Sequence, residues 1–275
     1  MKRLMSDRYF LGRKCVYCNS NKLYRLKIKK VKCKYCKKYY SLKRLRRNLE
    51  ILYYFYLELS ARKTAKELNL NYKTEQEKFM QFRRCINNFC ANEAQKLNGE
   101  LELDESYFGG KRKENRERGA NNKTIVFGII KNKILECAQE FNCKNSWHLE
   151  RKGQVYTKIV ENVSAEILME EIKNKTEKGS VFYTDGWRSY NDLKQFGKHN
   201  IIKHDKDQFA DGHNHINGIE GFWSFAKERF HKYHGINHAN YPMYLKEMEF
   251  RFNHRNESIF NLLFDICVRR LVGAK

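Results

Sequence analysis

The chain has 275 residues, 41% of them hydrophobic and 14% aromatic, and a formal net charge of +23. This length and apolar content predict a globular protein with one large domain or two to three small ones, and exclude a disordered tail. No run of eighteen apolar residues and no secretory leader is apparent, so we expect a soluble intracellular protein without membrane contact, cytoplasmic and nucleoid-associated, or nuclear in a eukaryotic host.

The positive charge is concentrated at the start of the chain. Residues 1–48 contain 18 Lys or Arg and one acid, Asp7, a balance of +17, and the other 227 residues share the remaining +6. A basic block of this kind attracts polyanions and releases their counterions, which favours nucleic acid as a partner. A solvated basic arm and a ribosome-like protein are the alternatives.

Four cysteines in the basic block form two Cys-x-x-Cys pairs. The stretches "CVYC" (Cys15, Cys18) and "CKYC" (Cys33, Cys36) are separated by fourteen residues. This spacing predicts a zinc ribbon over residues 1–48 with four thiolate ligands, in preference to a pair of redox motifs. The zinc would be structural, because a segment of about 45 residues cannot bury enough core to fold unaided.

The other five cysteines are scattered, and most are expected to be reduced core or surface residues. Of these, Cys137 and Cys143 lie near His148, but no fourth ligand is apparent, so a second metal site is not predicted.

Residues 49–97 have a helical pattern. Ser60 is placed to cap one helix, and Thr74 to cap another after the break "NLN". Two helices joined by a tight turn resemble a helix-turn-helix DNA-binding region, and a plain helical connector is the alternative.

After about residue 98 the pattern becomes strand-rich. The stretch "GELELDESYFGG" predicts one strand, "KTIVFGIIKNKILECAQEF" a hairpin turning at "KNK", and "GQVYTKIVEN" a further strand. A helix capped by Ser164 and stopped by Gly179 follows, then a buried strand ending in Asp185. The stretches "HINGIEGFWSFAKERFHKY" and "YPMYLKEMEFRFNHRN" predict helices. This order is compatible with a ribonuclease H-like α/β catalytic domain over residues 98–275.

Three acids stand out by position: Asp104 on the first of these strands, Asp185 at the end of the later strand, and Glu220 on a helix. Carboxylates placed in this way can bind hard divalent cations, and two such ions about 4 Å apart would promote phosphodiester chemistry. Two neighbouring acids are rivals: Glu105 points to the opposite face of the strand, whereas Glu102 shares the face of Asp104 and stays open.

Other readings of these acids also stay open. Taken singly, each could be a solvated charge. Lys227 follows Glu220 by two helical turns on the same face, where it could hold a phosphate.

The stretches "LELDESYFGGKRK", "VYTKIVEN", "VFYTDGWRSY" and "HINGIEGFWSFAKERFHKYHGI" together resemble the DDE transposases of bacterial insertion sequences. The similarity is to the ISXO2-like group and its eukaryotic relatives, the Merlin transposons, and it covers roughly residues 98–255. It implies Asp104 and Asp185 as the first two magnesium ligands and Glu220 as the third, accompanied by Lys227. Some subgroups have an asparagine as third residue, and Asn217 occupies that position here. The insertion at residues 141–153, "FNCKNSWHLERKG", departs from the family pattern and has no assigned role.

The resemblance implies a transposase that binds the double-stranded DNA of its element's ends, cleaves it and joins the 3′ ends to target DNA. The implied cofactors are two catalytic Mg²⁺ or Mn²⁺ ions beside the structural zinc, and the implied assembly is a homodimer that holds two ends. A domesticated, non-catalytic zinc-ribbon DNA-binding regulator is the alternative, although all three acids are present. A zinc-ribbon transcription or ribosomal accessory protein fits poorly, because the strand-rich domain is large.

Overall fold

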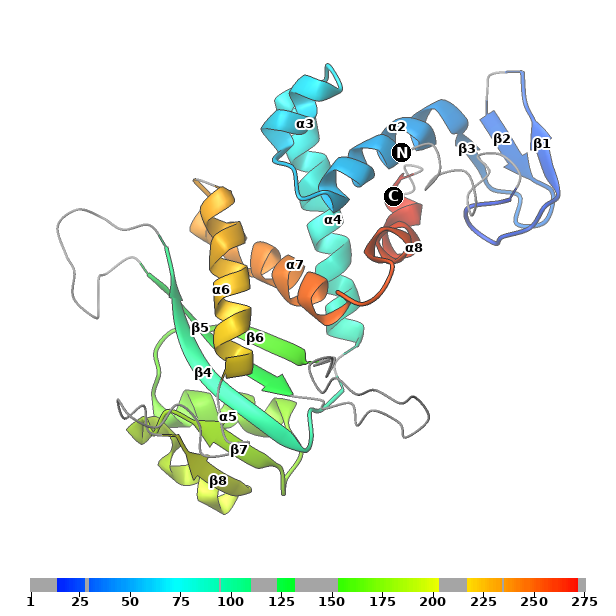
Figure 1. Cartoon of the computed structure of the whole chain (residues 1–275). Helices are drawn as coiled ribbons and strands as arrows, with labels where there is room; N and C mark the ends of the chain where they lie inside the picture. Colours follow the sequence, from blue (N-terminus) through cyan, green and yellow to red (C-terminus); the bar gives the residue numbers. More distant parts are fainter. Residues whose placement is uncertain are drawn as a thin grey trace, which may run out of the picture. The chain divides into compact units, whose positions relative to one another are not determined.

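The computed structural model describes residues 14–27, 30–93, 95–109, 123–131, 153–202, 217–233 and 235–271. The chain forms two compact units. One unit contains Met1–Ala91 together with His254–Lys275, and the other contains Asn92–Asn253 (Figure 1). No helix within the described residues combines the length and the apolar character that a membrane span needs.

The first unit begins with a small antiparallel sheet of three strands in the order β1-β2-β3. The strands are β1 (Leu23–Arg25), β2 (Lys30–Cys33) and β3 (Tyr39–Ser41). Val31, Cys33 and Tyr40 are buried on one side of this sheet, while their neighbours in the chain face solvent. We call the sheet and the two cysteine pairs (residues 14–41) the ribbon.

Four helices complete the first unit, and their apolar sides form its core. They are α2 (Leu42–Tyr56), α3 (Ala61–Glu67), α4 (Tyr72–Asn92) and α8 (Ile259–Leu271). Phe55 of α2 packs its ring against Phe79 and Phe82 of α4, and Phe260 of α8 packs against Tyr53. Helix α8, which the sequence patterns did not predict, therefore belongs to the core of the first unit.

The helix starts in this unit bear on two predictions. Ser60 caps α3 as predicted, because its hydroxyl accepts a hydrogen bond from Lys63 N. The predicted cap at Thr74 is wrong: α4 already begins at Tyr72, and the side chain of Asn71 accepts from Lys73 N at 2.9 Å. Asn caps helices as well as Thr does, and α4 therefore begins about one turn earlier in the chain than predicted.

The second unit is built on a five-stranded sheet with the order β6-β5-β4-β7-β8. Its strands are β4 (Glu100–Phe108), β5 (Thr124–Lys131), β6 (Gln154–Val160), β7 (Val181–Thr184) and β8 (Lys198–Ile201). The first three strands pair antiparallel in chain order, while β7 runs parallel to β4 and β8 runs parallel to β7. The crossover from β6 to β7 passes through a helix, as a parallel connection requires.

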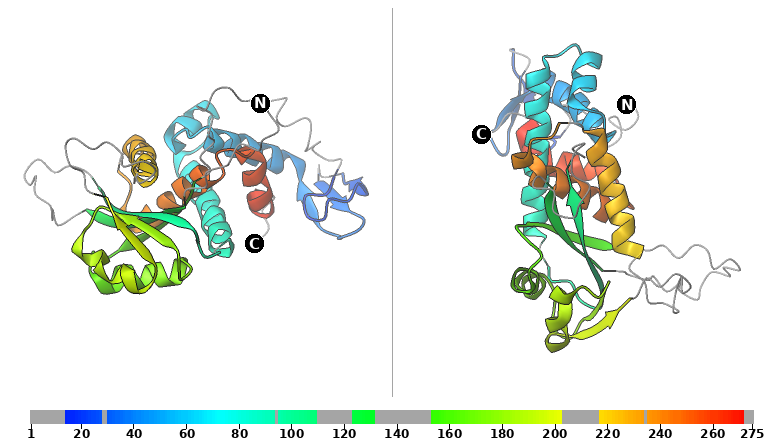
Figure 2. Two further views of the ribbon diagram at one scale, coloured as in Figure 1. Left: turned by 60° about the horizontal axis from the view of Figure 1, so that its bottom comes forward. Right: turned by 90° about the vertical axis from the view of Figure 1, so that its left-hand side faces the viewer.

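Helices cover both faces of this sheet (Figure 2). The long helices α6 (Asn217–Lys232) and α7 (Tyr241–Asn253), with the short η2 (His238–Asn240) before α7, cover one face. The helix α5 (Ala165–Lys175) and the 3₁₀ helix η1 (Arg188–Gln195) cover the other. The unit is therefore a mixed α/β structure with a hydrophobic core on each side of the sheet.

The edge strand β6 is covered by side chains of α7. Asn253 accepts from Val155 N at 2.7 Å and donates to Val155 O at 2.9 Å. Glu249 accepts from Thr157 N at 2.8 Å, and Lys246 donates to Thr157 O at 3.0 Å. These bonds satisfy the backbone groups that an edge strand leaves unpaired, and they fix α7 on the sheet.

Three predictions about this region are corrected or lie outside the described residues. Helix α5 begins after Ser164 as predicted but ends at Lys175, four residues before Gly179. There Thr176 joins an isolated bridge with Leu97, and its hydroxyl donates to Ile172 O. The second arm of the predicted hairpin, Cys137, Cys143, His148 and nearly all of the 141–153 insertion lie outside the described residues.

Candidate functional site

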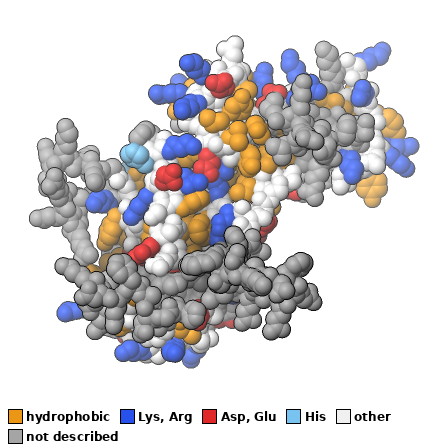
Figure 3. Space-filling model, viewed as in Figure 1, with side chains coloured by type: hydrophobic (Ala, Val, Ile, Leu, Met, Phe, Trp, Pro, Cys, Tyr) orange, Lys and Arg blue, Asp and Glu red, His pale blue; other side chains and the backbone are white. Residues whose placement is uncertain are grey.

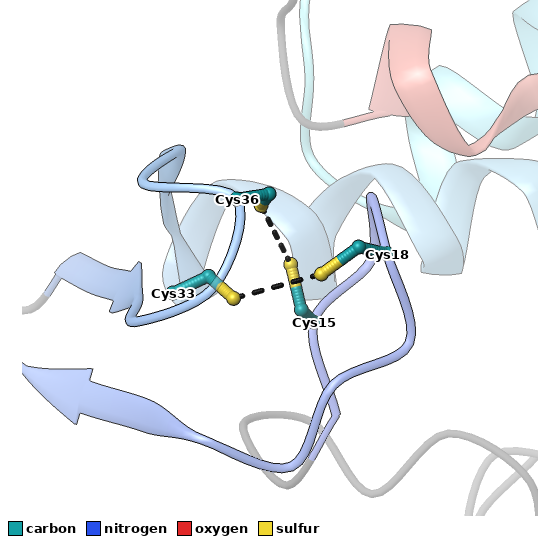
Figure 4. A group of neighbouring side chains, drawn as sticks. All are labelled: Cys15, Cys18, Cys33 and Cys36. Atoms are coloured by element: carbon teal, nitrogen blue, oxygen red, sulfur yellow. Dashed lines mark hydrogen bonds between the residues drawn. The ribbon is translucent and has the colours of Figure 1, made fainter.

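The four predicted thiol ligands lie together in the ribbon (Figure 4). The Sγ atoms of Cys15, Cys18, Cys33 and Cys36 all lie within 4.8 Å of one another. The Sγ atoms of Cys15 and Cys36 are 3.6 Å apart, and so are those of Cys18 and Cys33. Four sulfurs bound to zinc at about 2.3 Å in a tetrahedron would be about 3.8 Å apart, so the cluster fits this metal.

The backbone shapes both cysteine pairs in the same way. Asn19 directly follows Cys18, and Lys37 directly follows Cys36; both residues have a positive φ, 58° and 60°. Each pair closes with the same backbone hydrogen bond, from Cys15 N to Ser20 O and from Cys33 N to Lys38 O. The two left-handed residues turn the chain back at equivalent positions, which brings the two pairs face to face.

Backbone donors also favour an ionised thiol at this site. Burial raises the pKa of Cys15 to about 12. At Cys33 burial also opposes ionisation, but the backbone amides of Cys36 and Tyr35 lower the pKa of its thiol to about 6. Zinc binds the thiolate form, so Cys33 presents a ligand that is already deprotonated near neutral pH.

In the second unit, the pairing of β4 with β7 explains how two of the predicted acids meet. The parallel register pairs Leu101 with Phe182 and Glu102 with Tyr183. Continued for two residues, this register places Asp104 beside Asp185, which directly follows the last residue of β7. Tyr183 packs in the core under α6, and Asp185 has the same parity along the strand, so both acids belong to the face of the sheet that α6 covers.

Two hydrogen bonds join helix α6 to β4 at this point. Glu102, buried on β4, accepts from Ile219 N at 2.8 Å and so caps the first turn of α6. One helical turn further on, Trp223 Nε1 donates to Asp104 Oδ2 at 2.9 Å. Glu220 lies between these two anchors and is exposed. Glu102 therefore has a structural role in placing the helix that carries Glu220.

A glycine makes room for the tryptophan. Gly128 of β5 pairs with Asp104 in the antiparallel register. A Cβ at Gly128 would lie 2.6 Å from the ring of Trp223, closer than real side chains approach. The absence of a side chain at this position thus allows the indole to reach the carboxylate.

The charges of the other two acids affect the ionisation of Asp104. The pKa of Asp104 is raised to about 6, chiefly by burial and further by the negative charges of Asp185 and Glu220, against the opposing hydrogen bond from Trp223. Among the described residues no cationic side chain contributes to the pKa of Asp104, and a bound divalent cation would provide a counter-charge. Within the described part of the chain, the acids are less tightly grouped than the four cysteines, which are close enough together to hold a metal ion.

The acid next to Asp104 lies on the other face of the sheet, as the strand alternation predicts. Glu105 accepts a hydrogen bond from the hydroxyl of Tyr190, a buried residue of η1. The pKa of Glu105 is raised to about 7, chiefly by burial and further by the charges of Asp104 and Asp185, against the opposing hydrogen bond from Tyr190. Because η1 begins three residues after Asp185, this contact ties the segment that follows Asp185 to β4.

Two further predicted residues lie on the surface of α6. Asn217 is its first residue, three positions before Glu220, and Lys227 lies two turns beyond Glu220; both side chains are exposed. Residues three apart share one side of a helix, so position alone does not separate Asn217 from Glu220 as the third acid-site residue.

Sequence patterns missed Trp223, Gly128 and Tyr190. Trp223 and Tyr190 are aromatic residues at core spacing, and nothing in a local pattern shows that their polar atoms reach Asp104 and Glu105. Gly128 sits inside a strand, where a glycine signals a close approach of another group. The glycine in this strand therefore indicates a close approach, but the sequence does not show that the approaching group is the ring of Trp223.

Comparison with known proteins defines the class of this chain. Residues 96–253 match the ISXO2-like transposase domain, so the chain belongs to the ISXO2-like transposase family. A similar curated protein is an uncharacterized transposase-like protein of Haemophilus influenzae, 43% identical over 104 residues that cover 37% of this chain and 83% of that protein. The matched range lies entirely within the second unit, and it contains Asp104, Asp185 and Glu220.

Proposed function

We propose that this protein is a DDE transposase, which binds the end DNA of its element, cleaves it and joins the freed 3′ ends to target DNA. The observation that supports this most strongly is the raised pKa of Asp104, to which the charges of Asp185 and Glu220 contribute, within the range matched by the transposase domain. The family membership supports an enzyme that processes DNA, and the three acids supply groups suited to phosphodiester chemistry.

The sheet supports a ribonuclease H-like catalytic domain. In chain order its strands are arranged 3-2-1-4-5, with the first three antiparallel and the last two parallel to the first. A helix crosses over between the third and fourth strands, and helices cover both faces. This arrangement places the first strand in the centre, so that Asp104 projects from the best supported strand of the sheet.

The chemistry assigns a role to each residue. Asp104, Asp185 and Glu220 would hold two Mg²⁺ or Mn²⁺ ions, which supply positive charge at the attacking and leaving oxygens of the phosphodiester. Trp223 fixes the carboxylate of Asp104 by its hydrogen bond. Lys227 provides a cation on the same helix as Glu220 to hold a phosphate in place, and Asn217 is the alternative third residue.

The first unit would bind the DNA. Its ribbon would hold a structural zinc through Cys15, Cys18, Cys33 and Cys36, and α3 and α4 would serve as the helix-turn-helix. Lys and Arg side chains are spread over the surface of the ribbon and of these helices (Figure 3), as binding to phosphates requires. A homodimer would hold two element ends together, and the protein would act on DNA in the nucleoid or the nucleus.

A strand-transfer assay tests this proposal. Zinc-loaded full-length protein is incubated with labelled candidate end DNA, a target plasmid and Mg²⁺, and the products are separated on denaturing gels. We expect cleavage at the element end and joining of the labelled 3′ end to the plasmid, both abolished by a chelator of divalent ions. Specific binding of the end DNA without either product would instead identify a non-catalytic DNA-binding regulator.

A further inference from the structure

One face of the ribbon sheet has a row of three exposed side chains that the fold does not need. The antiparallel registers pair Tyr24 of β1 with Lys32 of β2, and Lys32 with Tyr39 of β3. The three residues therefore lie side by side across the sheet. We call them the Tyr–Lys–Tyr row.

The row does not contribute to the hydrophobic core. The side chains of Tyr24 and Tyr39 are 49% and 62% exposed, and Lys32 is exposed as well. The core of the ribbon is on the opposite face, where Val31 and Tyr40 are paired and buried. Two large aromatic rings exposed to water on one sheet face, on either side of Lys32, need an explanation other than stability.

The electrostatic surroundings indicate the kind of partner. The row lies in a segment without a single acidic residue from position 8 to position 48. The ammonium group of Lys30 lies 5.4 Å from the centre of the Tyr39 ring. Rings interleaved with lysines at this density attract a polyanion that also offers flat aromatic groups, which describes nucleic acid.

From this row we infer a binding site for unpaired DNA nucleotides, with Tyr24 and Tyr39 stacking on bases and Lys32 contacting the phosphate between them. The exposed rings favour a single strand over duplex DNA as the ligand, because the base faces of a duplex are already stacked on one another. Sheets bind unpaired strands by aromatic side chains on neighbouring strands, and each stacked base contributes about 1–3 kcal/mol. A surface for duplex alone would need the lysines but not the rings.

This inference deepens the proposed function, because it rests on the first unit acting as the DNA-binding part of a transposase. DNA cleavage and joining expose unpaired nucleotides at the element ends, and the row would hold such a strand. The test measures DNA binding and not transposition. A protein inactive in strand transfer could therefore still bind single strands through the row, and an active transposase could still lack this binding.

The experiment uses full-length zinc-loaded protein and two labelled probes. One probe is oligothymidine of about 15 nucleotides, and the other is a blunt duplex of the same length. The affinity for each probe is measured by fluorescence anisotropy over a series of salt concentrations. Tyr24→Ala and Tyr39→Ala should each weaken oligothymidine binding about 5- to 100-fold and change duplex binding less than about twofold. The salt dependence of oligothymidine binding should be the same in these variants as in the wild type, because stacking releases no counterions. Lys32→Ala should lower the salt slope for oligothymidine by about 0.7.

Matched variants separate stacking from damage to the ribbon. Tyr24→Phe and Tyr39→Phe keep the rings and should bind oligothymidine as the wild type does. Tyr35 is 79% exposed but lies outside the row, so Tyr35→Ala should have no effect. Zinc content is measured for each variant to show that the ribbon is intact. The inference is overturned if the zinc-loaded alanine variants of the row bind oligothymidine normally, or if they lose single-strand and duplex binding equally.

Discussion

Asp104 is the residue on which the proposed site depends most. Its carboxyl group is partly buried between β4 and α6, and the hydrogen bond from Trp223 offsets burial and the nearby charges of Asp185 and Glu220 only in part. The raised pKa, about 6, means that ionised Asp104 costs the folded protein free energy as long as no cation is bound. The site is therefore expected to be strained electrostatically in metal-free protein and relieved by divalent ions.

This cost gives a testable pH dependence. The folded-state pKa lies above the usual value, so the native protein binds more protons than the unfolded chain between about pH 4 and pH 6, and this contribution to stability is lost as the pH rises through 6. In metal-free protein at pH 7.5, Asp104→Asn should increase the free energy of unfolding by on the order of 2 kcal/mol, measured by urea denaturation. The gain should disappear below about pH 4.

Magnesium provides the control for this prediction. Binding to the native state should raise the melting temperature of the wild type and leave that of Asp104→Asn unchanged. A variant that is less stable than the wild type at pH 7.5 would contradict the electrostatic interpretation of Asp104.

A second residue-scale prediction concerns the third ligand. Glu220→Gln keeps the shape of the side chain but removes its charge, whereas Asn217→Ala removes an exposed amide at the start of α6. We expect strand-transfer activity to be abolished in Glu220→Gln and reduced less than about tenfold in Asn217→Ala, measured in single-turnover cleavage. The opposite pattern would assign the third position to Asn217.

The three acids were proposed from their positions on a central strand, after a strand and on a helix, and from the family resemblance, and their role stays a prediction. The parts that support them could not be named in this way. Trp223 and Gly128 meet Asp104 only through the pairing of β4 with β5 and the packing of α6, which a local pattern does not contain. Glu105 was correctly placed on the opposite face by strand alternation alone, but its partner Tyr190 was not foreseen.

At the scale of elements, the ribbon depends on its two cysteine pairs. We expect one equivalent of zinc in purified wild-type protein, measured by plasma emission, and less than about half an equivalent in Cys33→Ser. Chelation should unfold residues 10–45 preferentially, because metal binding supplies the folding free energy of so small a sheet. Cys90→Ser, outside the cluster, should keep its zinc, and undiminished zinc in Cys33→Ser would refute the four-thiolate site.

Element positions were more predictable than their ends. The strands β4 and β6 and the helices α6 and α7 follow clear periodic patterns, and the structure has them where those patterns lie. The end of α5 was misplaced because a tertiary contact of Thr176 with Leu97 stops the helix before Gly179 does. Strand β8, with the sequence KHNI, was missed because it is a short polar edge strand without alternating burial.

At the scale of the whole molecule, the division of charge predicts how DNA binding responds to salt. Residues 1–41 carry 14 of the 55 Lys and Arg side chains, and α2 begins only at Leu42, so they can be removed without cutting that helix. The truncated protein should bind duplex end DNA more weakly and with a shallower dependence on salt, measured by anisotropy between low and physiological salt. Unchanged affinity and slope would exclude the ribbon from DNA binding.

Cleavage and strand transfer by the three single acid variants test the central claim most directly. Asp104→Asn, Asp185→Asn and Glu220→Gln preserve side-chain shape and remove the charge that would hold the metal ions. Each should lose both cleavage and joining in the presence of Mg²⁺ while binding end DNA with wild-type affinity, and Lys227→Ala should lose less activity than any of them, because it positions a phosphate. If all three acid variants cut and join DNA at the wild-type rate, the proposed catalytic site is wrong.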